Sequence, residues 1–360
     1  MGKERIPVGV LGATGVVGQE LVRRLQSHPL FELVAVAASE RSAGRRYGEV
    51  VQWRAPGEIP EATARLEVKP AVPDLPCRLV FSALDATTAR GAEEVFARTG
   101  YAVISNASAW RMDPQVPLVV PEVNPDHIRL ARDQRFAPGA IVTNPNCCVA
   151  GLALVLKPLL DAFGVEEVMV TTLQAVSGAG YPGLSALDVL GNVIPLIPGE
   201  EEKLQAEPAK ILGSLVGGQM EPAPLRISAQ AMRVPVLDGH TLSVSVRLGR
   251  RAPVEDVRDV LGQWRGAPQA RGLPSAPQRP LVVSDDPNAP QPRRHLHAGN
   301  GMTVTVGRLR ACTVFDARLV ALVHNGVRGA AGAALLNAEL LVREGSIAAR
   351  HPAGGRLWVA

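Results

Sequence analysis

The sequence is poor in the features that mark disulfide-bonded and metal-binding proteins. Only four cysteines occur among 360 residues. Their irregular spacing, at positions 77, 147, 148 and 312, argues against a disulfide framework and predicts reduced thiols in a cytoplasmic protein. Two adjacent cysteines are not a zinc-type pair, and no histidine-rich cluster supplements them in the sequence, so we expect no metal site.

Long apolar runs and a strong charge of one sign are also missing. Apolar residues make up 46% of the chain, but no long uncharged apolar stretch occurs, so no membrane partner is expected. The formal net charge is only +4, and the basic residues are scattered without interleaved aromatic residues. We therefore expect no nucleic-acid partner, while a basic pocket for small anionic molecules stays open. The length suits two domains.

The first part of the chain alternates between strands and helices. An apolar strand at 6–11 runs directly into a glycine-rich turn, and a helix follows at 19–27. This order is the context of a dinucleotide-binding fingerprint, because glycines let the backbone approach a pyrophosphate that binds at the helix N-terminus. A simple tight turn is the alternative.

The rest of this part continues the same pattern. Strands are expected at 32–38, 78–83, 101–105 and 140–142, with a helix at 87–99. The predicted fold class is α/β, with a Rossmann-type doubly wound parallel sheet in residues 1–146.

The loop after the second strand bears on the choice of cofactor. An NAD enzyme places an acid here for the ribose hydroxyls, whereas an NADP enzyme places arginines and hydroxyl donors for the 2′-phosphate. Residues 39–46 contain one acid, Glu40, against Ser39, Arg41, Ser42 and two further arginines. This composition favours NADP, with a solvated loop that happens to be basic as the alternative.

After residue 146 the pattern is that of a second, α+β domain for catalysis and oligomerisation, at 147–324. We expect a helix at 152–163 kinked at Pro158, antiparallel strands at 167–175 and 242–247, a helix at 254–264, and strands at 303–308 and 315–323. The proline-rich stretch 266–292 is predicted to be a long surface loop or a subunit-contact arm. A last helix at 328–342 could close back on the first domain, which the segment 325–360 would complete.

The junction of the two domains carries the most reactive side chain. Asn146 follows an expected strand and precedes an apolar segment, which predicts an N-cap with Cys147 in the first helical turn. Unpaired backbone N–H groups and the positive end of the helix dipole favour the thiolate, which is the nucleophilic form of cysteine. The alternative is that either Cys147 or Cys148 is a small buried apolar residue.

Several short motifs occur in a fixed order over nearly the whole chain. They are GATGVVG at 12–18, SERSAG at 39–44, NASAWRM at 106–112, NPNC at 144–147, QAVSGAG at 174–180, GEEEK at 199–203, RVPVLDGH at 233–240 and NGVRGAAG at 325–332. In this order they resemble the aspartate-semialdehyde dehydrogenase family, most closely its archaeal and fungal branch. One departure is Cys148, where relatives more often carry Ser or Thr.

The resemblance implies a role for particular residues. It makes Cys147 the nucleophile, His240 the acid/base and Gln174 the residue that positions the reacting group. For the substrate, it implies Arg233 at the α-carboxylate, Glu200 at the amino group, with Glu201 as the other possible register, and Arg111 with Lys203 at the phosphate. The implied cofactor-binding residues are Gly12, Thr14, Gly15, Val16, Val17, Ser39, Arg41, Ser42, Ser82, Ser177, Gly178 and Asn325.

The implied reaction is the NADP-dependent reduction of L-aspartyl-4-phosphate to L-aspartate 4-semialdehyde through a cysteine thioester, in a homodimer or homotetramer. Such chemistry needs a soft nucleophile, a base, an anion site for phosphate and a hydride carrier. Two alternatives stay open. One is a related thioester-forming reductase acting on N-acetyl-glutamyl phosphate or malonyl-CoA, and the other is a non-catalytic NADP-binding protein.

Overall fold

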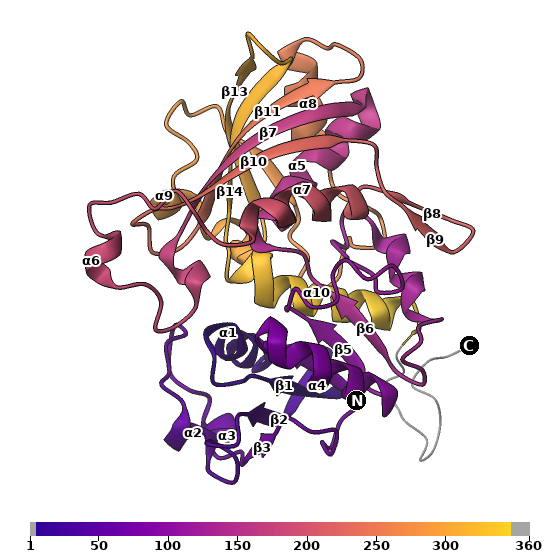
Figure 1. The fold of residues 1–360 in the computed structure, drawn as a ribbon, viewed down its shortest axis with the longest axis vertical. Helices are drawn as coiled ribbons and strands as arrows, with labels where there is room; N and C mark the ends of the chain where they lie inside the picture. Colours follow the sequence, from indigo (N-terminus) through magenta and orange to yellow (C-terminus); the bar gives the residue numbers. More distant parts are fainter. Residues whose placement is uncertain (1–4, 347–360) are drawn as a thin grey trace.

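The computed structural model describes residues 5–346, which form two sheet-based parts, one above the other in Figure 1. The first part is built on a six-stranded sheet in the order β3-β2-β1-β4-β5-β6, and all of its pairs are parallel. Its strands are β1 (Ile6–Leu11), β2 (Phe31–Ala38), β3 (Val68–Pro70), β4 (Leu79–Ser82), β5 (Ala102–Ser105) and β6 (Ala140–Thr143). The strand order reverses next to β1, as in a doubly wound Rossmann-type sheet, which confirms the predicted fold class.

Helices cover both faces of this sheet, so its central strands are buried throughout. Every residue of β4, β5 and β6 is buried, as expected for apolar strands in a parallel sheet. The helices of this part are α1 (Val16–Leu25), α2 (Tyr47–Val50), α3 (Glu61–Ala64), α4 (Ala86–Arg98) and the 3-10 segment Pro125–Ala131.

The end of the chain returns to the first part. After a π-helical turn at Val327–Ala331, α10 (Gly332–Arg343) contributes Ala334, Leu335 and Leu340 to the same apolar core as Val8 of β1. In Figure 1 this yellow helix lies between the two sheets. The turn just before α10 therefore lies at the boundary between the two parts.

The second part contains a mixed six-stranded sheet in the order β10-β7-β11-β14-β13-β12. Its strands are β7 (Val165–Gln174), β10 (Arg226–Arg233), β11 (His240–Leu248), β12 (Leu281–Val283), β13 (Val304–Ala311) and β14 (Ala317–Val323). The predicted antiparallel pairing of the strands near 170 and 244 is confirmed, because β7 and β11 pair antiparallel.

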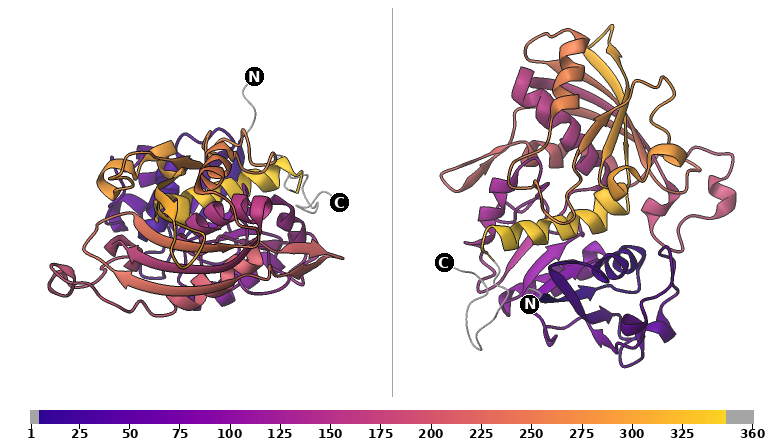
Figure 2. Two further views of the ribbon diagram at one scale, coloured as in Figure 1. Left: turned by 90° about the horizontal axis from the view of Figure 1, so that it is seen from above. Right: turned by 180° about the vertical axis from the view of Figure 1, so that it is seen from behind.

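Helices cover only one face of this second sheet. The helices α5 (Cys147–Phe163) and α8 (Val254–Gln263) pack on that face around a core of buried aliphatic residues, and Figure 2 shows them from behind. On the uncovered face, Met169 and Leu173 of β7 are exposed. Alternating burial along β7 and β11 follows from this one-sided packing.

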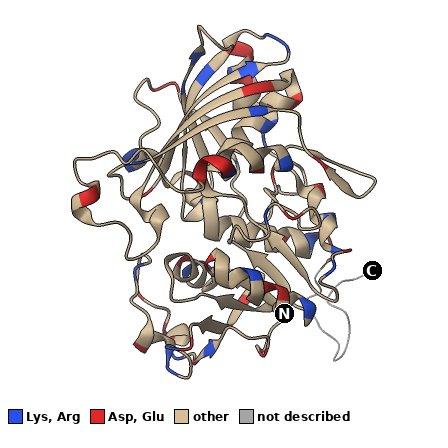
Figure 3. Cartoon of the chain, in the orientation of Figure 1, with Lys and Arg blue, Asp and Glu red and all other residues tan. Residues whose placement is uncertain are grey.

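Smaller elements connect these layers. They are α6 (Ala186–Val189), α7 (Glu200–Ile211), α9 (Pro292–His295), the hairpin of β8 (Ser214–Val216) and β9 (Gln219–Glu221), and 3-10 segments at Val176–Ala179 and Ala298–Gly301. Between residues 5 and 346, no helix is both long and apolar enough to cross a bilayer. Acidic and basic residues are interspersed along the ribbon in the view of Figure 3.

The prediction of a long surface loop or subunit-contact arm at 266–292 needs a partial correction: most of the stretch has no helix or strand, but it is not a loop throughout. The stretch contains β12, which pairs with β13, and Ala270, Leu273 and Ala289 within it are buried. High proline content limits regular backbone hydrogen bonding, but it does not keep the intervening aliphatic side chains out of a core.

Candidate active site

The glycine-rich turn after β1 is closely packed and leaves a helix end free. Gly12 has a φ of +73°, and a Cβ there would lie 2.6 Å from the Ala83 carbonyl oxygen; a Cβ on Gly18 would lie 2.2 Å from the Gly12 oxygen. Gly15 is the N-cap of α1, and no side chain caps this end. Gly15 and Val16 are exposed, so the first N–H groups of α1 are open to an anionic ligand.

The other predicted cofactor residues fall into two groups. Ser39 and Arg41 are exposed and Ser42 is half-buried in the turn after β2. Ser177 and Asn325 lie on the side of the cysteine, where Asn325 Nδ2 donates to Ser177 Oγ over 2.8 Å. A Cβ on Gly178 would lie 2.9 Å from Arg233 Nη1 and 3.0 Å from His240 Cε1, so this glycine borders the catalytic side chains.

Three further residues predicted to bind the cofactor are partly or fully buried. Thr14 and Val17 are half-buried around the turn. Ser82 ends β4 next to β1, but it is fully buried and its Oγ has no hydrogen-bond partner among the described residues.

Asn146 caps helix α5 and positions the cysteine pair. Its Oδ1 accepts hydrogen bonds from the Cys148 N–H at 2.9 Å and the Val149 N–H at 3.4 Å. Cys147 is the first residue of α5 and is half-buried, whereas Cys148 is fully buried. A Cβ on Gly329 would lie 2.4 Å from the Cys147 Cβ, so the turn before α10 rests directly on the nucleophile.

His240 lies beside the two thiols. A ring nitrogen of His240 and the Sγ atoms of Cys147 and Cys148 lie within 4.8 Å of one another. The structure thus brings together Cys147 and His240, the two residues that the resemblance implies as nucleophile and acid/base. The three residues belong to α5 and the start of β11, 93 positions apart in the chain, and only the fold unites them.

The hydrogen bonds of His240 define its neutral tautomer. Its Nδ1 accepts from the Ala175 N–H at 3.0 Å, and its Nε2 is buried without a partner among the described residues. Because Nδ1 accepts, the neutral ring carries its proton on Nε2. His240 therefore offers a donor to a neighbouring sulfur or oxygen.

The surroundings of Cys147 favour its thiolate. The pKa of the Cys147 thiol is lowered well below its ordinary value, first by the hydrogen bond from the Cys148 thiol and then by His240, against the opposing effect of burial. Burial raises the pKa of Cys148 well above its ordinary value. The two neighbours therefore differ: the surroundings favour the thiolate at Cys147 and the protonated thiol at Cys148.

A cavity of about 340 Å³ opens beside Cys147 and is lined by Gln174, Glu200 and Arg233, among others. Glu200 accepts from Lys203 Nζ at 2.8 Å, from Asn146 Nδ2 at 2.8 Å and from Gln174 Nε2 at 3.1 Å. Burial opposes ionisation, but these donors lower the pKa of Glu200 below its ordinary value. The cavity thus holds a carboxylate close to a guanidinium.

Arg233 and Glu201 complete the picture of this cavity. Arg233 Nη1 donates to the Ala175 oxygen at 2.6 Å, and its Nε is buried without a partner among the described residues. Glu201 turns to β10 instead, where it accepts from the Ala231 N–H at 3.0 Å. Glu200, and not Glu201, lines the cavity.

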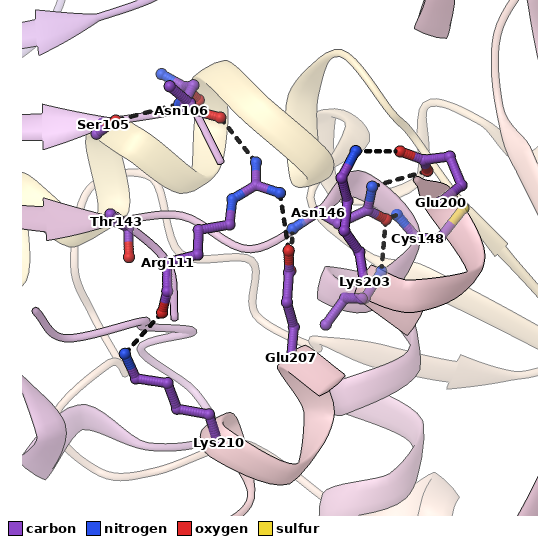
Figure 4. A network of polar contacts seen from close by, with 12 residues as sticks. Ser105, Asn106, Arg111, Thr143, Asn146, Cys148, Glu200, Lys203, Glu207 and Lys210 are labelled. Atoms are coloured by element: carbon purple, nitrogen blue, oxygen red, sulfur yellow. Dashed lines mark hydrogen bonds and ion pairs between the residues drawn. The ribbon is translucent and has the colours of Figure 1, made fainter. Parts of the chain in front are cut away.

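Arg111 and Lys203 belong to one polar network around Asn146 but do not contact each other directly (Figure 4). Arg111 donates to Glu207 Oε1 at 3.0 Å and to the Asn106 oxygen at 2.8 Å, and Glu207 Oε2 accepts from the Asn146 N–H at 2.6 Å. Lys203 reaches the network through Glu200.

Two residues of this network were not singled out from the sequence. Glu207 pairs with Arg111, and Lys210 donates to the backbone oxygens of Arg111, Asp113 and Val116 over 2.6 to 2.7 Å. Together with Glu200 and Lys203 they occupy positions i, i+3, i+7 and i+10 of α7. This helical spacing is the signal that could have revealed a buried charged face.

The parallel nucleotide-type sheet and the open end of α1, with a cysteine beside a cavity at the start of α5, are the features of a nucleotide-dependent dehydrogenase. Sequence models agree with this class: residues 7–131 match "Semialdehyde dehydrogenase, NAD binding domain", and residues 156–328 match "Semialdehyde dehydrogenase, dimerisation domain". The chain belongs to the aspartate-semialdehyde dehydrogenase family.

Individual relatives support this membership over nearly the full length. The aspartate-semialdehyde dehydrogenase of Methanothermobacter thermautotrophicus is 49% identical over 343 residues, which cover 93% of this chain and 99% of the relative. That of Cryptococcus neoformans is 45% identical over 361 residues, covering 96% and 99%. The crystal structure of the Candida albicans enzyme with NADP superposes with a TM-score of 0.87 at 40% identity, covering 95% and 99%. The predicted resemblance to the archaeal and fungal branch is confirmed.

Proposed function

We propose that this chain is an NADP-dependent, phosphorylating aspartate-semialdehyde dehydrogenase, which reduces L-aspartyl-4-phosphate to L-aspartate 4-semialdehyde in the biosynthesis of aspartate-family amino acids. The observation that carries the proposal is the Cys147 thiolate at the start of α5, beside His240 and a cavity lined by Glu200 and Arg233. Relatives with this name at 45% to 49% identity support the same assignment.

The charges of the cavity match an amino acid. Arg233 can form a bidentate pair with an α-carboxylate, and Glu200 is an ionised acceptor for an ammonium group. An N-acetylated substrate lacks that ammonium charge, and malonyl-CoA has no amine. Glu200 therefore favours the aspartyl substrate over the alternatives considered above.

The reaction begins with the attack of Cys147 Sγ on the C4 carbonyl carbon. A carbon–sulfur bond forms and the bond from C4 to the phosphate oxygen breaks, which leaves a thioester on Cys147. Arg111 and Lys203 supply positive charge for the departing phosphate, and Gln174 holds the reacting group in place. When the aldehyde leaves, the carbon–sulfur bond breaks, and His240 acts as the acid by donating through Nε2–H to the departing Cys147 sulfur.

The residues of the first part fit a dinucleotide. The open N-terminus of α1 at Gly15 and the close-packed Gly12 suit a pyrophosphate. The exposed hydroxyl and guanidinium groups of Ser39 and Arg41 suit a 2′-phosphate, and Asn325 would lie near the nicotinamide. NADPH, when bound, supplies the hydride that reduces the thioester.

The direct experiment is a spectrophotometric assay of NADPH formation from NADP and L-aspartate 4-semialdehyde, with and without phosphate. We expect turnover that depends on phosphate and is lost in Cys147→Ala, while this variant still binds NADPH. Unchanged turnover in Cys147→Ala would rule out the thioester route. Absence of turnover in the wild-type chain, despite NADPH binding, would favour the non-catalytic alternative.

The choice between NADPH and NADH is tested at Arg41. Arg41→Ala should weaken NADPH binding about tenfold or more, because a charge-assisted contact with the 2′-phosphate is lost, and should leave NADH binding nearly unchanged. Fluorescence titration measures both affinities. Arg65→Ala is the matched control, since Arg65 pairs with Glu61 on α3. Equal weakening for NADPH and NADH would show that Arg41 does not contact the 2′-phosphate.

The protein is further proposed to act as a homo-oligomer, either a homodimer or a homotetramer, in the cytoplasm. The uncovered face of the second sheet and the exposed apolar residues Leu187, Leu190 and Leu196 offer contact surfaces. All four cysteines are free, which suits a reducing compartment.

A further inference from the structure

Cys148 enters the reaction described above only through its hydrogen bond to Cys147, and its sulfur forms no bond to the substrate. The Sγ atoms of Cys147 and Cys148 and a ring nitrogen of His240 are within 4.8 Å of one another. Cys147 also lines the cavity of about 340 Å³, so a small molecule that enters this cavity meets one thiol with a second directly behind it. Cys147 is reached from the cavity, whereas Cys148 is fully buried.

A zinc-type site with three protein ligands does not follow from this arrangement. Imidazole binds a metal through an unprotonated nitrogen and usually donates its other N–H to an acceptor. In His240 the Ala175 N–H occupies Nδ1, so the proton lies on Nε2, which points away from that contact. His240 can therefore donate a hydrogen bond to a bound group, but it is a poor ligand. What remains is a pair of thiols.

We propose that Cys147 and Cys148 form a dithiol site for trivalent arsenic oxyacids such as arsenite. Arsenous acid loses two hydroxyl groups and gains two sulfur ligands: two As–O bonds break, two As–S bonds form and two water molecules leave. The Cys148 thiol supplies one of the protons, and solvent supplies the other when Cys147 reacts in the thiolate form that its surroundings favour. Arsenic stays trivalent, and no electrons are transferred.

The remaining As–OH group has a partner in the site. His240 Nε2 is buried and unpartnered among the described residues, and a ring nitrogen of His240 lies within 4.8 Å of both sulfur atoms. It can donate to the arsenic-bound oxygen, which replaces the hydrogen bond that the incoming oxyacid made with water. The two sulfur atoms already lie within 4.8 Å of each other. Occupied in this way, Cys147 can no longer attack a substrate.

The experiment treats the full-length wild-type protein with arsenite and with phenylarsine oxide, and measures two quantities. Intact mass spectrometry should show one arsenic per chain, and peptide mapping should locate it on the segment that contains Cys147 and Cys148. Turnover should fall in parallel and return with a dithiol but not with a monothiol at equal concentration. Because the mass measurement does not depend on activity, it stays informative even if the proposed reaction fails.

Cys148→Ser is the decisive variant, because serine preserves the size of the side chain and removes one sulfur. Relative to its own untreated rate, it should need at least tenfold more arsenite for half-inhibition, and its arsenic adduct should disappear from the mass spectrum. Cys77→Ser and Cys312→Ser, which alter cysteines outside the site, should behave like the wild type. NADPH titration checks that each variant is folded. If Cys148→Ser does not fold, Cys148→Ala takes its place.

Two results would overturn the proposal. One is a Cys148→Ser or Cys148→Ala protein that keeps the arsenic adduct and the sensitivity of the wild type. The other is a wild-type protein that takes up no arsenic, or that carries it on a peptide without Cys147 and Cys148.

Discussion

Glu200 differs from the other carboxylates of α7 in what it faces. Glu201 is bound to the backbone of β10 and Glu207 to Arg111, whereas Glu200 lines the cavity beside Cys147. Its neighbours keep it ionised, since they hold its pKa below the ordinary value. In the proposed function, Glu200 is the residue that supplies the negative charge for the amino group of the substrate.

We expect Glu200→Gln to lower kcat/KM for L-aspartate 4-semialdehyde by about tenfold to a hundredfold, because one charged hydrogen bond to the substrate is lost. The matched control Glu201→Gln should have a much smaller effect. NADPH affinity should stay unchanged in both variants. Equal losses in the two variants, or an equal loss of Glu200→Gln with a substrate that lacks an amine, would contradict the assigned role.

The buried carboxyl group of Glu93 affects the stability of the protein, and it lies outside the proposed active site. Glu93 of α4 is completely buried, and its Oε1 accepts from Ser105 Oγ at 2.7 Å. Burial raises the pKa of Glu93 from an ordinary 4.5 to about 7. The folded protein therefore binds this proton more tightly than the unfolded chain, and stability falls as the pH rises through the window between these two values.

Glu93→Gln should relieve this cost. We expect the variant to exceed the wild type in unfolding free energy by up to about 3 kcal/mol at pH 8, with the difference shrinking towards pH 5. Chemical denaturation at the two pH values measures it. Glu94→Gln, at an exposed neighbour that pairs with Arg98, should show no such pH-dependent gain. A gain of equal size at both pH values would point to packing instead of ionisation.

At the scale of elements, the start of α5 depends on one side chain. Asn146 accepts from two N–H groups of the helix, donates through Nδ2 to Glu200, and donates through its backbone N–H to Glu207. Asn146 therefore caps α5 and also holds Glu200 and Glu207, the partner of Arg111.

Asn146→Ala should destabilise the protein by about 1–2 kcal/mol, because the first turn of α5 loses its cap. It should also slow the alkylation of Cys147 by iodoacetamide, since the first turn frays. Asn146→Ser restores a capping oxygen and should recover most of the stability. If serine and alanine were equally destabilising, the loss would have to come from the contact of Asn146 Nδ2 with Glu200.

The sequence predicted those elements whose signal is local. Apolar runs predicted β1 and β4, alternation predicted β7 and β11, and a capping residue predicted the start of α5. The three-residue strand β3 is too short to show a period. β10 alternates small and polar residues, so its pattern of burial does not appear as a hydrophobic pattern.

The parts of the site that the sequence did not predict depend on distant contacts. Arg111 and Glu207 are 96 positions apart, and the acidic start of α7 reads as a solvated helix end until the fold buries it. The tautomer of His240 depends on a backbone N–H 65 residues away. No local pattern encodes such pairings, and the family resemblance supplied roles without contacts. The division of the chain after residue 146 stays a prediction.

At the scale of the whole molecule, the C-terminal segment links the nucleotide-type part to the site. Arg328 forms a buried ion pair with Glu122 at 2.7 Å and donates to the Met302 oxygen. Asn337 of α10 donates to Asn144, close to the Asn146 cap. The turn between Arg328 and α10 thereby holds the backbone against Cys147, so the position of Cys147 depends on the segment 328–343.

The outer surface carries one further feature that a single chain leaves unsatisfied. Around α6, Leu187 is 91% exposed, Leu190 70% and Leu196 64%, and Figure 1 shows this segment projecting to one side of the molecule. An apolar group of this kind, within the region that matches the dimerisation domain, is typical of a subunit contact.

Replacing both Leu187 and Leu190 with Asp should shift the mass measured by sedimentation from that of an oligomer towards that of a monomer, because two charges would have to be buried in the contact. Val314→Asp is the control, since Val314 is 72% exposed on a different part of the surface; it should keep the wild-type mass. Circular dichroism checks that the double variant is folded. An unchanged mass in the folded double variant would exclude this segment from the subunit contact and leave the uncovered face of the second sheet as the remaining contact surface.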